Sequence, residues 1–243
     1  MIDVIAFDAD DTLWHNEILY YQTQRRFQEL LVPYCGDDGV LDALYKIEMA
    51  NLPHYGYGIK SFALSMIETA VRVTDGKIIG RDIQRIVDLA KEMQQAPVQL
   101  LGNVAEVIPA LSAVYPLMLI TKGDLFDQEA KILRSGLLSY FSAVEVVTDK
   151  TPEIYRALLA KHQINPRRFL MVGNSLRSDI LPIVSLGAHA VHIPYHITWE
   201  HEVVPMAADS TAEYQVLEHI GLLLEYVARL GSGTRPDNNL QRA

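Results

Sequence analysis

The sequence predicts an α/β protein with a Rossmann-like, three-layer α/β/α core around a parallel sheet. Short apolar runs rich in β-branched residues recur along the chain, which is typical of strands buried on both faces. Helix-length segments with apolar residues at three- and four-residue spacing separate the later runs, and this alternation indicates parallel βαβ units. We expect five strands, at Val4–Phe7, Leu117–Ile120, Val144–Val147, Phe169–Val172 and Ala190–Ile193.

Helical periodicity accounts for most of the chain after residue 103. The apolar spacing predicts helices at Val104–Val114, Asp127–Arg134, Pro152–His162, Asp179–Leu186 and Ala212–Leu230. The last segment, 231–243, is polar and contains glycine, proline and asparagine, so we expect a disordered tail.

The stretch between the first two strands has a different character. Residues 15–95 contain no convincing strand, and glycines and prolines divide them into helical patterns at Glu17–Leu31, Val40–Ala50, Ser61–Val73 and Arg81–Gln94. We therefore predict a four-helix insert over 15–95, placed directly after the first strand. The remaining core would comprise residues 1–14 and 96–230.

Composition limits the classes of partner. The 243-residue chain carries a formal net charge of −9, which disfavours nucleic acids and anionic membranes as partners. A single cysteine, Cys35, excludes an internal disulfide and a cysteine-based zinc site. No stretch approaches the ~20 apolar residues of a membrane span, and the first residues lack a basic targeting region. We expect a cytoplasmic protein with no membrane or nucleic-acid partner.

An acidic cluster follows the first strand at once. Asp8, Asp10, Asp11 and Thr12 come directly after Val4–Phe7. Burying carboxylates without a partner is costly, and ligands of open α/β sheets bind at the carboxyl ends of the strands. The cluster therefore indicates a site that holds a cation. Asp11 has a simpler interpretation, as a turn or helix cap.

Three further polar points follow later strands. Thr121 ends the second apolar run, Lys150 precedes a helix start, and Asn174 and Asp179 follow the fourth run. Phosphoryl transfer needs a nucleophile, a cation that offsets charge repulsion and donors for the phosphate oxygens. A carboxylate can be the nucleophile, a second can act as acid and base, and oxygen ligands suit Mg²⁺.

This ordered set resembles the haloacid dehalogenase (HAD) superfamily in its phosphatase branch, and the insert resembles that family's C1 cap. The resemblance implies that Asp8 is the nucleophile and that Asp10 is the general acid and base. It implies that Thr121 and Lys150 bind and neutralise the phosphoryl group. Mg²⁺ would be held by Asp8, the backbone carbonyl of Asp10, Asn174 and Asp179. Many relatives have aspartate in place of Asn174, so whether Asn174 or Asp179 binds the metal directly stays open.

Several residues are candidates for substrate contact. Relatives with such a cap read the substrate through the loop between their second and third cap helices, which here contains Tyr55, Tyr57 and Lys60. An ordinary glycine-rich turn is the simpler interpretation of that loop. Lys122, beside Thr121, is a further candidate, and so are His196 and Trp199. The histidines at 189–201 lack the spacing of a helical zinc site.

The resemblance thus implies a Mg²⁺-dependent phosphatase that hydrolyses a small phosphorylated metabolite through an aspartyl-phosphate. A phosphoryl-transferring mutase and a non-enzymatic phosphate-binding protein are alternatives. A 2-haloacid dehalogenase is disfavoured, because those relatives typically lack an acid at the position of Asp10. The substrate's identity, the role of residues 189–201 and the choice between monomer and homodimer stay open.

Overall fold

The computed structural model describes residues 2–36, 38–204 and 213–231. Within these residues the core is a six-stranded sheet in the order β3-β2-β1-β4-β5-β6, and every neighbouring pair is parallel. The strands are β1 Val4–Phe7, β2 Leu117–Lys122, β3 Ala143–Val147, β4 Phe169–Gly173, β5 His189–His192 and β6 Gln215–Val216. The predicted fold class and the five predicted strands are confirmed.

The strand register brings together the polar residues that the sequence places at the ends of the strands. Phe7, the last residue of β1, pairs with Leu119 on one side and with Val172 on the other. Because the strands are parallel, the residues that follow β1, β2 and β4 emerge at the same edge of the sheet. Asp8, Thr121 and Asn174 therefore share that edge.

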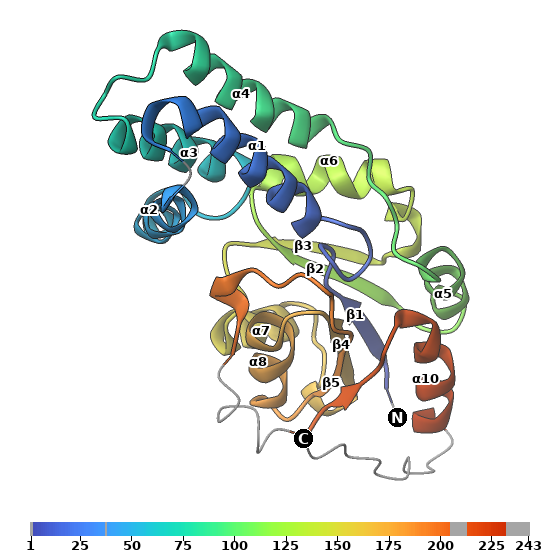
Figure 1. Cartoon of the computed structure of the whole chain (residues 1–243). Helices are drawn as coiled ribbons and strands as arrows, with labels where there is room; N and C mark the ends of the chain where they lie inside the picture. Colours follow the sequence, from blue (N-terminus) through green and yellow to red (C-terminus); the bar gives the residue numbers. More distant parts are fainter. Residues whose placement is uncertain (1, 37, 205–212, 232–243) are drawn as a thin grey trace.

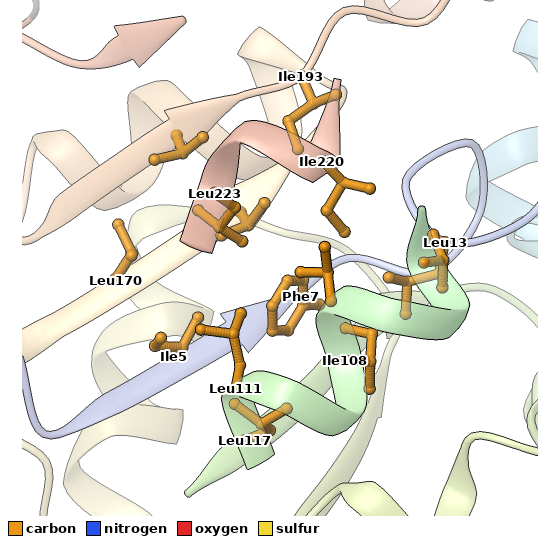
Figure 2. Packing of buried hydrophobic residues seen from close by; sticks show 14 of the residues in the cluster. Ile5, Phe7, Leu13, Ile108, Leu111, Leu117, Leu170, Ile193, Ile220 and Leu223 are labelled. Atoms are coloured by element: carbon orange, nitrogen blue, oxygen red, sulfur yellow. The ribbon is translucent and has the colours of Figure 1, made fainter. Parts of the chain in front are cut away.

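Helices cover both faces of the sheet (Figure 1). One face packs against α5 Val104–Ser112, α6 Leu125–Ser135 and α10 Leu223–Gly231, and the other against α7 Pro152–Lys161 and α8 Leu181–Val184. On the first face the ring of Phe7 lies among apolar side chains of several elements, as Figure 2 shows for Ile5, Ile108, Leu111, Leu117 and Leu223. Asp8 is thus attached to one of the most buried segments of the chain.

Four helices lie between β1 and β2 in the sequence and form a separate bundle beyond the sheet (Figure 1). They are α1 Glu17–Cys35, α2 Val40–Tyr55, α3 Ile59–Val73 and α4 Gly80–Gln95. The bundle has its own apolar core, which includes Phe27, Leu44, Met66 and Ile86. The predicted helical insert is confirmed, while its limits at 15 and 95 stay predictions.

Two of the predicted helices are wrong in part. The segment predicted as a helix from Ala212 instead forms β6, a short 3₁₀ turn at Ile220–Leu222 and then α10. Pairing with β5 satisfies the backbone there and still buries Leu217 and Ile220. Its first residue, and 232–243 of the expected tail, lie outside the described residues.

The helix predicted from Asp179 begins earlier and is irregular. Leu176–Ile180 forms a π-helical turn that precedes the short α8. Such turns are frequent at functional sites, because the wider turn redirects side chains. Asp179 lies within this turn. Among the described residues, no helix combines the length and the apolar character needed to cross a membrane.

We expect Ile108→Ala to destabilise the core. Ile108 is fully buried in α5, so the change removes apolar contacts and leaves a cavity, which should cost about 2–5 kcal/mol of unfolding free energy. Urea denaturation followed by circular dichroism measures the loss. Val114→Ala, at a position that is 71% exposed, is the matched control. Equal stability of the two variants would contradict the packing described here.

Candidate active site

A buried lysine joins two carboxylates at the carboxyl edge of the sheet. Lys150, between β3 and α7, places its Nζ 2.5 Å from Asp8 Oδ1 and 2.6 Å from Asp179 Oδ1. All three side chains are buried. Burial raises the pKa of Asp8 to about 7. The charge of Lys150 lowers this pKa, whereas the charge of Asp179 raises it further. Burial lowers the pKa of Lys150, but Asp179 and Asp8 outweigh it and hold that pKa well above its usual range.

The remaining oxygens of these carboxylates are also oriented. Thr12 Oγ1 lies 2.9 Å from Asp8 Oδ2 and 3.2 Å from Asn174 Oδ1. Asp179 Oδ2 accepts the backbone N–H of Ser175 at 3.0 Å. A Cβ at Gly173 would lie 2.4 Å from Asp179 Oδ2, so only glycine allows this approach. The sequence pattern did not identify the role of Gly173.

Asp10 has a separate set of partners. Lys131 Nζ lies 2.8 and 2.7 Å from its two oxygens, Gln128 Nε2 donates at 2.8 Å and Trp14 Nε1 donates at 2.7 Å. Burial alone would raise the pKa of Asp10, but Lys131 and the other donors lower it. Sequence reasoning missed Lys131 and Gln128. The pattern that could have revealed them is a pair of polar residues, three apart, on the face of α6 that is otherwise buried.

Asp11 acts as a turn and helix-capping residue, the simpler of the two roles that the sequence suggests for it. Its carboxylate accepts the backbone N–H groups of Asn16 and Glu17 at 2.9–3.1 Å, and so caps the start of α1. Its φ of 61° marks the tight turn that follows β1. Burial raises the pKa of Asp11 to about 7, although the two backbone donors oppose this.

These groups line a cavity of ≈ 170 Å³ between the core and the helical insert. The core contributes Asp8, Asp10, Thr121, Lys150 and Asp179, together with Asn174. The insert contributes residues from α1, α2, α3 and the loop between α2 and α3. The seven residues expected in the catalytic and metal sites or beside Thr121 all line this cavity: Asp8, Asp10, Thr121, Lys122, Lys150, Asn174 and Asp179. Tyr57, from the loop between α2 and α3, lines it too.

Lys122 is engaged by protein groups. Its ammonium forms an ion pair with Glu202, donates to Ser178 Oγ at 2.9 Å and lies 4.4 Å from the ring centroid of Tyr57. Glu202 also accepts hydrogen bonds from Ser175 and Ser178. Sequence reasoning missed the role of Glu202, because it lies ten residues after the end of β5 and belongs to no motif. Lys122 thus ties the insert's loop to the core.

The other expected substrate contacts are distributed differently. Tyr57 and Trp199 line the cavity and pack edge to face, with ring centroids 6.1 Å apart. Tyr55 is 56% exposed and lies outside the cavity lining. Lys60 is also outside it, in a solvent-exposed ion pair with Asp124 at 3.0 Å. His196 is not part of the lining and contacts the ring of Tyr195 at a tilt, with centroids 4.3 Å apart.

The donor set at the sheet edge fits a hard cation. The side chains of Asp8, Asp179 and Asn174 line the cavity, and each carries oxygens of the kind that Mg²⁺ takes as ligands. The described residues contain no group of three or more His, Cys, Asp or Glu side chains arranged for a metal. Asp8, Asp179 and Asn174 do not form such a group, because only two of the three are of these residue types.

The model of the haloacid dehalogenase-like hydrolases matches residues 2–187 of this chain. The chain belongs to this family. A HAD-like family hydrolase from Xanthomonas campestris is 36% identical, with a TM-score of 0.84 over 96% of this chain and 93% of that one. No curated protein matches the chain.

Two more distant HAD structures share the fold. A 2-haloacid dehalogenase from Pseudomonas syringae is 20% identical, with a TM-score of 0.63 over 95% of this chain and 100% of that one. The HAD-hydrolase YfnB from Bacillus subtilis, solved with bound magnesium, is 14% identical, with a TM-score of 0.67 over 93% and 99%. At these identities the likeness concerns the fold alone.

We expect Glu202→Gln to change how stability depends on pH. Burial would raise the pKa of Glu202, but Lys122 and the serine donors lower it from 4.5 to about 2. A carboxyl whose pKa falls on folding stabilises the protein above its unfolded pKa, and this contribution is lost as pH falls from about 4.5 towards 2. It amounts to roughly 3 kcal/mol at neutral pH.

The measurement is urea denaturation of wild type and variant at pH 7, 5 and 3. The difference in unfolding free energy should be largest at pH 7 and should shrink at pH 3. Glu200→Gln, at an exposed neighbouring position, is the control and should leave the pH dependence unchanged. A difference that is constant over this range would contradict the ion pair with Lys122.

Proposed function

We propose that this HAD-like hydrolase is a Mg²⁺-dependent phosphatase that acts on a small phosphate monoester. One observation carries the proposal. A second carboxylate, Asp10, lines the cavity of Asp8 and is held by its own lysine, Lys131. Burying a further ion pair is costly for a fold, and a displacement that releases a halide needs no acid at that position. An alcohol leaving group does need one.

In the first step, Asp8 Oδ attacks phosphorus, and the bond from phosphorus to the ester oxygen breaks. Lys150 contacts Asp8 and offsets the negative charge that gathers there. The hydroxyl of Thr121, the penultimate residue of β2, would donate to a phosphoryl oxygen; its place in the cavity wall supports this role. When bound, Mg²⁺ would supply the positive charge that lets an anionic ester approach a carboxylate. Asp8, Asp179, Asn174 and the carbonyl of Asp10 would hold it.

Asp10 serves both steps. In the first it must be protonated, so substrate entry has to draw Lys131 and Gln128 away from it; burial then raises its pKa, and the carboxyl can give its proton to the departing alkoxide. In the second the ionised carboxylate takes a proton from water, the water oxygen bonds to phosphorus, and the bond to Asp8 breaks. The lowered pKa of Asp10, due to Lys131 and the other donors, favours this ionised form.

A dehalogenase is the second candidate. Lys150 already compensates Asp8 and Asp179, and Asn174 supplies a neutral oxygen, so the carboxylates have partners without a metal. The two candidates differ in their cation requirement and in the bond they break. Mutase chemistry would be recognised by a phosphoryl group that reappears on a second substrate oxygen.

We expect EDTA to abolish hydrolysis of p-nitrophenyl phosphate and added Mg²⁺ to restore it. The reason is charge: the cavity wall holds more carboxylates than lysines, and a phosphate dianion adds further negative charge. Release of p-nitrophenolate measures the rate. Chloride release from 2-chloropropionate in EDTA, with no phosphatase activity, would replace this proposal with the dehalogenase.

We expect Asp8→Asn to lower kcat for p-nitrophenyl phosphate by more than about a thousandfold, because an amide cannot act as the nucleophile. Asp3→Asn, the same chemical change just before β1 in a surface ion pair with Arg168, should leave kcat unchanged. Mass spectrometry of the acid-quenched wild type should find the phosphoryl adduct on Asp8. An adduct on any other residue would contradict the mechanism.

A further inference from the structure

Two carboxylates of the helical insert line the same cavity without a partner. Glu17 begins α1 and Glu48 lies in the middle of α2, and both face the cavity. Neither side chain has a hydrogen bond or ion pair with any group in residues 2–36, 38–204 and 213–231. Both are only partly exposed. An ionised carboxylate in such a position costs free energy unless a cation or donors reach it.

The lysines of the cavity wall are already engaged elsewhere. Lys150 is paired with Asp8 and Asp179, Lys131 with Asp10, and Lys122 with Glu202. In the described part of the wall, no lysine or arginine is left to compensate the insert's two carboxylates. A positive charge that keeps Glu17 and Glu48 ionised would therefore have to come from outside the described residues.

Among the described residues, the cavity wall contains a second kind of unpaired acceptor, the side-chain oxygen of Gln128. Gln128 is 3% exposed and lines the cavity, and its Nε2 is fixed by donation to Asp10. Its Oε1 is buried and accepts no hydrogen bond from any described residue. Buried polar atoms of this kind are rare in folded proteins and are satisfied by water or a ligand. The wall thus lacks donors at more than one point.

The pKa values of Glu17 and Glu48 are consistent with carboxyl groups that have no compensating partner within the described chain. Burial raises the pKa of Glu17 to about 8, and Asp11 and Glu48 contribute further repulsion. Burial raises the pKa of Glu48 to about 7. A cation bound between them would restore the ionised forms, because an opposite charge lowers the pKa of a carboxyl.

We propose that the phosphate ester cleaved here carries a primary ammonium on its alcohol part, and that Glu17 and Glu48 bind this group. The substrate class is the phosphate monoester of an amino alcohol or amino sugar, and the inference rests on the function proposed above. An ammonium brings three donors and one charge to a wall that offers acceptors. A neutral polyol would supply donors and leave both charges uncompensated.

The surroundings suit such a molecule. Tyr20 and Phe62 line the cavity next to each other, with ring centroids 5.0 Å apart, and Leu52 adds an apolar surface. Aromatic faces attract cations and also pack against the alkyl stem that carries them. The cavity of ≈ 170 Å³ is smaller than the roughly 300–1,000 Å³ of sites for drug-sized ligands. A metabolite of a few carbons fits this size better than a nucleotide.

Binding to an inactive variant tests the inference apart from turnover. Calorimetry with Asp8→Asn and Mg²⁺ compares matched esters: O-phosphoethanolamine with ethyl phosphate, and glucosamine 6-phosphate with glucose 6-phosphate. We expect the aminated member of at least one pair to bind about 10- to 100-fold more tightly, the range of a charge-assisted hydrogen bond. Adding Glu48→Gln should reduce that ratio towards one.

Glu29→Gln is the control, since it makes the same change at an exposed position of α1 and should leave the ratio as it is. Circular dichroism checks that each variant is folded, and Glu17→Gln gives a second reading of the ratio. Equal affinity within every pair, or a ratio that survives both glutamate changes, would overturn the inference. A preference for aminated esters in Asp8→Asn, with no hydrolysis by the wild type, would instead contradict the proposed function alone.

Discussion

The active site is organised around one buried ammonium that touches two carboxylates. Lys150 contacts Asp8 and Asp179 at 2.5 and 2.6 Å in a place where water cannot screen their charges. Without it, two like charges would lie together in a medium of low dielectric constant. The sheet makes the arrangement possible, because β1, β3 and β4 end at the same edge and deliver one member each. Removing one partner of such a group leaves a buried charge uncompensated, which destabilises proteins strongly.

The cavity divides its charges between the core and the insert. On the core side, each carboxylate near the site of chemistry has a lysine: Asp8 and Asp179 share Lys150, and Asp10 has Lys131. On the insert side, Glu17 and Glu48 have none within the described chain. The core therefore presents carboxylates whose charges are already compensated, and under the proposed function the phosphate group binds there. The insert presents two carboxylates that no described lysine or arginine of the wall compensates, and under our proposal the ammonium of the substrate compensates them.

Contacts between insert and core close this cavity from several directions. Tyr57, in the loop between α2 and α3, lies over the Lys122 ammonium and packs on Trp199. Lys60 pairs with Asp124 at the start of α6. Lys122 is in turn held by Glu202. These contacts are polar or aromatic, and the Lys60–Asp124 pair is partly exposed to solvent, where such pairs contribute little to stability. Gly173 and the π-helical turn play the opposite part and fix Asp179 rigidly.

The sequence by itself determined the features that depend on local patterns. Buried parallel strands are continuous apolar runs, so β1 to β5 and the acidic residues after β1 could be found, and the insert was evident from its helical periodicity. Only the tertiary structure decided which residues compensate one another. Lys131, Gln128, Glu48 and Glu202 belong to none of the motifs, and β6 depends on pairing with β5 rather than on its own pattern. Charge and hydrogen bonding act through space, so their partners are fixed by the packing of elements that no local pattern encodes.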